Sequence, residues 1–152
     1  VNLESLNKDG KKSTLVHEDK DRLKPIVEAR LSGALENTDL AHLRELKNLR
    51  ILEITDAPKI TDAGLAYLAG LTNLEEFTLK NTGVTGGGLG ILSQFTKLQI
   101  LGLEGIPLDP THLEILGKIT TLERVKINAP VEEHLELLTK LPNLKTVYLP
   151  PN

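Results

Sequence analysis

Two histidines at matching places along the chain are the first residues whose type and spacing could do chemistry. His112 and His134 occupy equivalent positions in two similar segments, and Glu132 and Glu133 directly precede the second histidine. Two imidazoles and a carboxylate are ligands that zinc accepts, but protein zinc sites take three or four converging ligands. We therefore interpret these residues as surface groups at helix starts and expect no metal site.

A glycine-rich stretch is the second candidate, because backbone N–H groups at such a turn can cradle phosphate. Residues 83–88 read Gly-Val-Thr-Gly-Gly-Gly and lie between a predicted strand and a predicted helix. A P-loop needs Lys followed by Ser or Thr after its last glycine, whereas this chain continues with Leu89 and Gly90. We interpret the stretch as a structural turn.

Other kinds of chemistry find little support in the composition. The chain has no cysteine, so it has neither a thiol nucleophile nor cysteine metal ligands. No serine, histidine and acid fall together on elements that would form a cleft. We expect no catalytic residue, no cofactor and no enzymatic activity. The net charge of −3, with signs mixed along the chain, gives no basic stripe for nucleic acid, and no apolar run approaches the ~18 residues of a membrane span.

A repeated apolar pattern predicts the helices and strands that position the histidines and the glycine-rich stretch. Five segments follow Leu-x-x-Leu-x-x-Leu-x-x-Leu-x-x-Leu-x-Leu, with Ile, Val or Phe allowed for Leu: Leu40–Ile54, Leu65–Leu79, Leu89–Leu103, Leu113–Ile127 and Leu135–Leu149. A period in the twenties is typical of a solenoid, in which each unit buries its apolar face only against its neighbours. Each copy predicts a helix, a turn and a short strand, and a helix between successive strands makes those strands parallel.

The predicted helices have recognisable starts. Thr61, Thr85 and Asp109 occupy the same place in three copies, and each side-chain oxygen can accept a free N–H of the helix that follows. Pro110 comes directly after Asp109, at the first helical position, where its missing N–H costs nothing.

The ends of the repeat array differ from its middle. Ile26, Ala29 and Leu31 match the strand half of the pattern and predict a sixth strand ahead of the five. Residues 1–25 break the period, and their alternation predicts a β-hairpin that pairs residues 11–18 with residues 26–31 and caps the open end. We expect a single structural domain with an N-terminal capping segment over 1–25 and a repeat region over 26–152.

The stretch Ile60–Thr85, which reads ITDAGLAYLAGLTNLEEFTLKNTGVT, resembles leucine-rich-repeat proteins. More narrowly, it is similar to the bacterial, planctomycete-type T-D-x-G-L subfamily, which is related to the cysteine-containing repeat class. The resemblance covers Ile26–Leu149 and implies an α/β arc with a parallel sheet of about six strands on the concave side and helices outside. Members often carry Asn or Cys three residues after each strand. Here only Thr82 and Asn152 could make the same bond, so we expect that turn to rest on apolar packing.

Strand alternation indicates which side chains lie on the concave face. Ile51 and Ile100 fall in one column, Gly102 leaves a low spot beside Ile100, and Arg124 and Lys126 form a basic row. Aliphatic, arginine and aromatic anchors are typical of protein interfaces. The candidate partner-binding residues are Ile51, Glu53, Thr78, Ile100, Gly102, Arg124, Lys126 and Tyr148.

The sequence thus predicts a non-catalytic scaffold that recognises an unidentified protein partner through its concave sheet and the adjoining loops. The alternative is a regulatory domain, or an extracellular ligand- or glycan-sensing domain, of a larger protein. Six strands at ~4.8 Å spacing offer ~300–500 Å² of sheet against ~800 Å² per partner in a standard interface, so the loops would have to contribute. We expect a soluble monomer, either cytoplasmic or exported after removal of an upstream signal.

Overall fold

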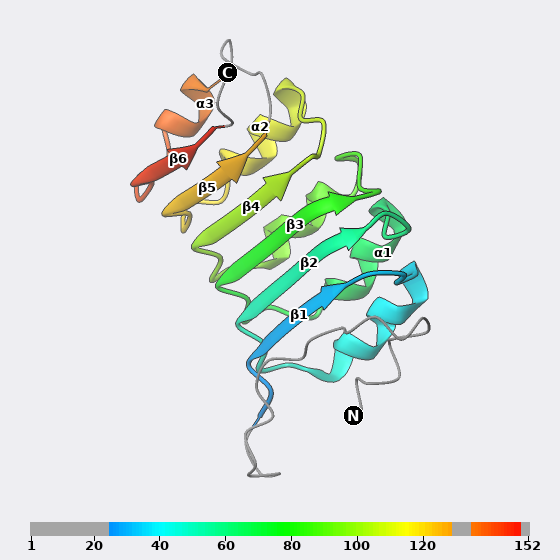
Figure 1. Cartoon of the computed structure of the whole chain (residues 1–152). Coiled ribbons are helices and arrows are strands. Elements are labelled where there is room, and N and C mark those ends of the chain that lie inside the picture. The colour runs from blue at the N-terminus through cyan, green and yellow to red at the C-terminus, as the bar shows by residue number, and fades with distance from the viewer. Residues whose placement is uncertain (1–24, 129–134, 150–152) are drawn as a thin grey trace.

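The sheet runs through the whole of the described chain. The computed structural model describes residues 25–128 and 135–149. In this part of the chain, six strands form one parallel sheet in sequential order (Figure 1): β1 (Glu28–Ser32), β2 (Ile51–Ala57), β3 (Glu76–Thr82), β4 (Ile100–Glu104), β5 (Arg124–Ile127) and β6 (Thr146–Tyr148). The sixth strand expected ahead of the five copies is present as β1. The predicted parallel sheet of about six strands is confirmed.

Helical segments connect successive strands and lie together behind the sheet (Figure 1): η2 (Asn37–Glu45), α1 (Asp62–Leu65), η3 (Ala66–Leu68), η4 (Leu89–Gln94), α2 (Pro110–Leu116) and α3 (Glu136–Thr139). Those labelled η are 3₁₀ helices, which the apolar spacing did not distinguish from α-helices. A 3₁₀ helix rises ~2.0 Å per residue against ~1.5 Å in an α-helix. A 3₁₀ helix therefore returns the chain from the end of one strand to the start of the next with fewer residues than an α-helix needs.

The core is a set of apolar columns that run across the strands. One column consists of Leu52, Phe77, Leu101, Val125 and Val147, in this order in the strand register. Its first four members are fully buried, and Val147 is only partly buried because no further described strand covers β6. The Phe77 ring meets the Phe95 ring edge to face, with centroids 5.5 Å apart. This packing locks the strand register, since a slip of one residue would move every core side chain to the open face.

The helix starts agree with the expectation only in part. Asp109 accepts a hydrogen bond from the His112 N–H at 3.0 Å, and Pro110 opens α2 as expected. Thr61 precedes α1 but its hydroxyl does not cap the helix; it accepts from Asn37 Nδ2 at 2.8 Å. The predicted cap at Thr85 is wrong, because η4 begins four residues later and Gly88 directly precedes it.

Four strands share a left-handed backbone position at or directly after their C-terminal ends, where the chain turns toward the next helical segment. Asp56 and Asn81 both have φ of 50°, and Gly33 and Gly105, at the same place in their repeats, have φ of 96° and 78°. Glycine, asparagine and aspartate are the residues that tolerate this left-handed conformation best. Asn81 Nδ2 also donates to Asp56 Oδ1 at 2.8 Å, which links the two neighbouring turns.

The position after these turns is largely apolar, as expected. Ala57 and Ile106 are fully buried there. Thr82 Oγ1 is also buried, but it has no hydrogen-bond partner within the described residues. Thr82 therefore does not make the inter-repeat bond that its hydroxyl would allow, and Asn152 lies outside the described residues. Apolar packing thus supports this position at Ala57 and Ile106, whereas Ala34, at the same place in the first repeat, is exposed.

Two further expectations concern the N-terminal cap and a membrane-spanning helix. The predicted hairpin partner, residues 11–18, lies outside the described residues, so the capping segment over 1–25 and its boundary stay predictions. Across residues 25–128 and 135–149, no helix combines the length and apolar character needed to cross a membrane.

Candidate functional site

The open face of the sheet carries three columns of outward side chains, which the register defines strand by strand. The first column is Glu28, Ile51, Glu76, Ile100, Arg124 and Thr146; the second column is Arg30, Glu53, Thr78, Gly102, Lys126 and Tyr148. The third column is Ser32, Thr55, Lys80 and Glu104. All eight candidate residues from the sequence fall in the first two columns, so the fold brings them onto one continuous surface.

Ion pairs neutralise most charges of the second and third columns. Arg30 Nε lies 3.4 Å from a Glu53 carboxylate oxygen, and Glu104 lies between two lysines, 3.0 Å from Lys126 Nζ and 3.7 Å from Lys80 Nζ. Exposed pairs of this kind add little to stability. They do consume the charges of Glu53 and Lys126, two of the candidate residues, within the protein itself. The role of Glu104 was missed because it depends on side chains two strands apart.

The first column is different, because two of its charges stay available. Glu76 and Arg124 form no ion pair with any residue that the structure describes, and each neighbours Ile100 across the sheet. Ile51 and Ile100 are partly buried and flank Glu76 on both sides. This column therefore combines apolar surface with unpaired charges of both signs.

The expected low spot at Gly102 is not open. Gly102 is buried, and a Cβ built on it would lie 2.9 Å from Thr78 Oγ1 and 3.0 Å from Thr78 Cγ2. The threonine side chain leans over the glycine from the neighbouring strand. A larger residue at position 102 would have to displace Thr78, so Gly102 does not simply point to solvent, as strand alternation had suggested.

The last described strand adds an apolar patch. Tyr148 is 53% exposed at the end of the second column, and Leu149, next to it in the chain, is 45% exposed. Exposed large apolar side chains are rare in the described chain, with Val27 the one other example. Paired aromatic and aliphatic groups of this kind are typical of contact surfaces.

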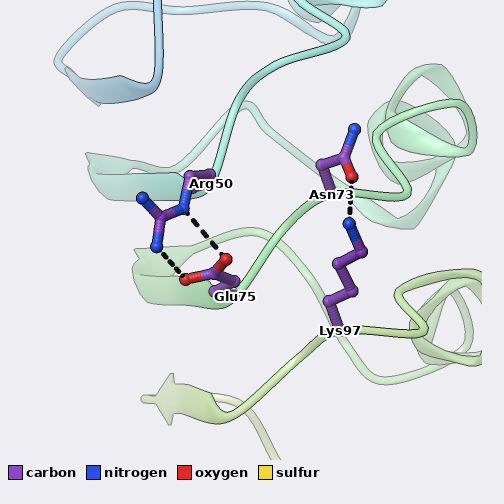
Figure 2. Close-up of polar contacts among 4 residues, drawn as sticks. All are labelled: Arg50, Asn73, Glu75 and Lys97. Carbon is purple, nitrogen blue, oxygen red and sulfur yellow. Dashed lines mark hydrogen bonds and ion pairs between the residues drawn. The ribbon is translucent and has the colours of Figure 1, made fainter.

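The edge at which the strands begin carries a second polar system, which the sequence analysis missed. Arg50 donates two hydrogen bonds to Glu75, at 2.9 and 2.6 Å, and Lys97 Nζ donates to Asn73 Oδ1 at 2.7 Å (Figure 2). The hydrogen bond from Arg50 lowers the pKa of Glu75 more than its slight burial raises it. Two shallow hollows of about 390 and 330 Å³ adjoin this edge and share Glu75 and Lys97.

The sequence signal for this edge is the run of mostly charged residues directly before the strands, whose position becomes recognisable from the strand bounds. The residue directly before each of the strands β1 to β5 gives its carbonyl oxygen to two N–H groups of the next repeat, as Arg50 does for Glu75 and Glu76. The side chains at this place are Arg50, Glu75, Gln99, Glu123 and Lys145. The outer pairs are salt bridges, Arg50 with Glu75 and Lys145 with Glu123, and Gln99 is the uncharged member between them.

The hydrogen-bond donors of the glycine-rich stretch are bound by a carboxylate of the protein, that of Asp62. Asp62 Oδ2 accepts from the Thr85 hydroxyl at 2.6 Å and from the Thr85 N–H at 3.2 Å, and Asp62 Oδ1 accepts from the Gly88 N–H at 2.8 Å. Burial raises the pKa of Asp62, but these hydrogen bonds and one from Gly86 outweigh it and hold the pKa below the usual aspartate value. An internal carboxylate thus takes the place that a phosphate would have.

His112 has a structural role. Its Nδ1 accepts from the Asp109 N–H at 3.0 Å, and a Cβ at Gly86 would lie within 2.5 Å of its Nε2. The imidazole therefore closes the first turn of α2 and rests on the glycine-rich loop of the preceding repeat. The described residues hold no group of three His, Cys, Asp or Glu side chains that could bind a metal ion. His134, Glu132 and Glu133 lie outside that part of the chain.

Comparison with known proteins finds similarity at the level of fold. No protein-family profile and no curated protein sequence matches the chain. Among solved structures, it is similar to the internalin InlF of Listeria monocytogenes, at 21% identity and a TM-score of 0.56, over 80% of this chain and 34% of that one. It is also similar to internalin C2 of Listeria monocytogenes, at 24% identity and a TM-score of 0.53, over 86% of this chain and 56% of that one.

The chain spans about a third and about half of the length of these two structures. At such identities the similarity concerns the course of the backbone and not the residues of any site. The parallel strands in sequential order, the helices behind them and this similarity together identify the chain as a protein of the leucine-rich-repeat fold.

Proposed function

We propose that the chain is a non-catalytic recognition module that binds a protein partner through the first and second columns of its concave face. The observation that carries this proposal is the first column, in which partly buried Ile51 and Ile100 alternate with Glu76 and Arg124, whose charges form no ion pair with any described residue. A surface that only faced solvent would have no need of apolar groups there. Binding energy is typically concentrated in a few such apolar and arginine anchors.

The proposal includes the last strand and the strand-start edge as the rim of the interface. Tyr148 extends the second column with an exposed aromatic ring, and the Arg50–Glu75 pair borders the first column from the strand starts. Polar, solvent-exposed rims around a partly apolar centre are the usual anatomy of protein interfaces. We also propose that the free protein is a monomer and that Thr61–Leu65 (TDAGL) places it in the T-D-x-G-L subfamily.

The test is affinity capture from the native organism with matched variants. Ile100→Glu puts a charge at the centre of the first column, whereas Glu114→Lys changes an exposed residue of α2 on the opposite side of the sheet. A partner captured by the unaltered chain and by Glu114→Lys, but not by Ile100→Glu, would support the proposal. Capture that survives Ile100→Glu, with circular dichroism showing both variants folded, would refute it.

A further inference from the structure

Glu76 and Arg124 are the charged side chains of the concave face that form no ion pair with the residues described in the structure. They lie on either side of Ile100 in the first column, and Ile51 lies on the far side of Glu76. The column therefore presents the order apolar, acidic, apolar, basic over four neighbouring strands. This order specifies the chemistry of a ligand that would meet all four groups.

The sheet sets the intervals between these groups. Neighbouring strands lie about 4.8 Å apart, so the column from Ile51 to Arg124 covers about 14 Å in three equal steps. A ligand that meets all four groups must present side chains on one face at nearly the same interval.

An α-helix lying across the strands meets this condition. Its positions i, i+3, i+7 and i+10 share one face, and with a rise of about 1.5 Å per residue they lie about 4.5, 6 and 4.5 Å apart. The four positions cover about 15 Å, close to the length of the column. An extended segment presents a side chain to the same face only every ~6.6 Å. This interval exceeds the ~4.8 Å interval of the column, so the two sets of side chains are out of register after one site.

The second column leaves room for the width of a helix. Columns on one face are about 6.6 Å apart, whereas a helix with its side chains is about 10 Å across, so the helix must overlap the second column. Beside Ile100 and Glu76 that column carries Gly102 and Thr78, a residue with no side chain and a small one that leans over it. The Thr78 side chain fills the space above Gly102, so the flank of the helix would meet one small side chain and no bulky one there.

We infer that the ligand of the concave face is an amphipathic α-helix of a partner protein, lying across the strands. Two of its apolar side chains contact Ile51 and Ile100, a basic side chain between them pairs with Glu76, and an acidic side chain pairs with Arg124. This inference rests on the proposed function and adds the secondary structure and the side-chain order of the ligand.

The test uses helical peptides of about 16 residues, built on alanine and glutamine, which span about the width of six strands. One peptide carries leucine, lysine, leucine and glutamate at i, i+3, i+7 and i+10. A second carries the same four residues in reverse order, because the column allows either direction of the helix. Control peptides exchange the lysine and the glutamate, and a further control has two central prolines that break the helix.

Fluorescence anisotropy titrations should show that one of the two matched peptides binds at least about tenfold more tightly than its exchanged control, the equivalent of one interfacial charge pair. The proline control should lose binding. The double variant Glu76→Lys and Arg124→Glu keeps the net charge and should reverse the preference, and Glu114→Lys should leave it unchanged.

Equal binding of matched and exchanged peptides, no binding of either matched peptide, a preference that survives the double variant, or tighter binding of the proline control would overturn the inference. Such a result would leave the proposed function standing if Ile100→Glu still abolishes capture of the native partner. If Ile100→Glu captures the partner as well as the unaltered chain does, the proposed function itself is refuted.

Discussion

The carboxylate of Asp62 accepts a hydrogen bond from the backbone N–H of Gly88, at 2.8 Å, across a separation of 26 residues. The same carboxylate accepts from the hydroxyl and the N–H of Thr85. The first helix of one repeat is thereby tied to the glycine-rich loop of the next. These hydrogen bonds fix the glycine-rich loop around the Asp62 carboxylate.

Replacing Asp62 should therefore destabilise the arc. Asp62→Ala removes the carboxylate that accepts from the Thr85 hydroxyl and from the N–H groups of Thr85 and Gly88, which lose their partner in the protein. We expect the free energy of unfolding to fall by about 1–2 kcal/mol, as for the loss of a capping carboxylate. Urea denaturation at pH 7 measures this change, and a loss below about 0.3 kcal/mol would show that the contact is unimportant.

The effect of Asp62→Ala should also depend on pH with a defined sign. The pKa of Asp62 is lower in the folded protein than the usual aspartate value. Such a group contributes stability above its unfolded pKa of about 3.9, and the contribution is lost as the pH falls through the folded pKa. The difference between the parent and Asp62→Ala should be constant near pH 7 and shrink below about pH 4. A difference as large at about pH 2 as at pH 7 would contradict the role of the carboxylate charge.

Phe77 should be one of the most sensitive core positions. Its ring is fully buried in the central strand β3 and meets Phe95 edge to face. Phe77→Ala leaves a cavity and should cost about 3–5 kcal/mol of unfolding free energy, as large-to-small core substitutions do. Thermal or urea denaturation checks this value. Thr96→Ala, at an exposed turn, is the control and should change little; a comparable loss in both variants would argue against the predicted specificity.

Gly86 and Gly90 form a matched pair for testing the glycine-rich loop. Gly86 has φ of 106°, and a Cβ there would collide with the His112 ring, whereas a Cβ at Gly90 would meet no atom within 4 Å. Gly86→Ala should cost at least about 1 kcal/mol, and Gly90→Ala should be neutral or stabilising by up to about 1 kcal/mol. Equal melting temperatures for the two variants would mean that the loop adapts without strain.

Gln99 is the one uncharged side chain in the row directly before the strands, called here the charge ladder: Arg50, Glu75, Gln99, Glu123 and Lys145. Its neighbours in the ladder, Glu75 and Glu123, are both acidic and pair outward with Arg50 and Lys145. Gln99→Lys would place a cation between the two carboxylates and should stabilise the arc by less than about 1 kcal/mol, whereas Gln99→Glu should destabilise it. Melting curves in low salt measure both, and the effects should shrink in 1 M salt, where charges are screened beyond ~3 Å. Stabilisation by Gln99→Glu would contradict the claim that Glu75 and Glu123 act electrostatically on the side chain at position 99.

Much of the fold could be predicted from the sequence, because the repeat encodes the register directly. Leu52, Phe77 and Leu101 hold the same place in the pattern, and a parallel sheet of stacked repeats must align them. The helix type could not be predicted in the same way. Apolar spacing of three to four residues fits both α and 3₁₀ helices, and the choice depends on how many residues each repeat has to return the chain to the start of the next strand.

The concave face was predicted as a set of residues but not as a set of contacts. Alternation places Lys126 and Glu104 on the open face, but their ion pair depends on the rotamers of side chains in neighbouring strands. The burial of Gly102 under Thr78 has the same origin. The contact of Asp62 with Gly88 joins residues a full repeat apart, and nothing in the local pattern of either indicates it.

The central claim, that a partner protein binds the concave first column, is tested most directly by carboxyl footprinting. Carbodiimide coupling followed by mass spectrometry measures how fast Glu76, in the first column, and Glu114, on the exposed side of α2, are modified with and without the captured partner. We predict that the partner slows the modification of Glu76 several-fold and leaves Glu114 unchanged, because interface side chains are shielded from solvent. Protection of Glu114 with no change at Glu76 would place the partner on the outer helices and contradict the claim.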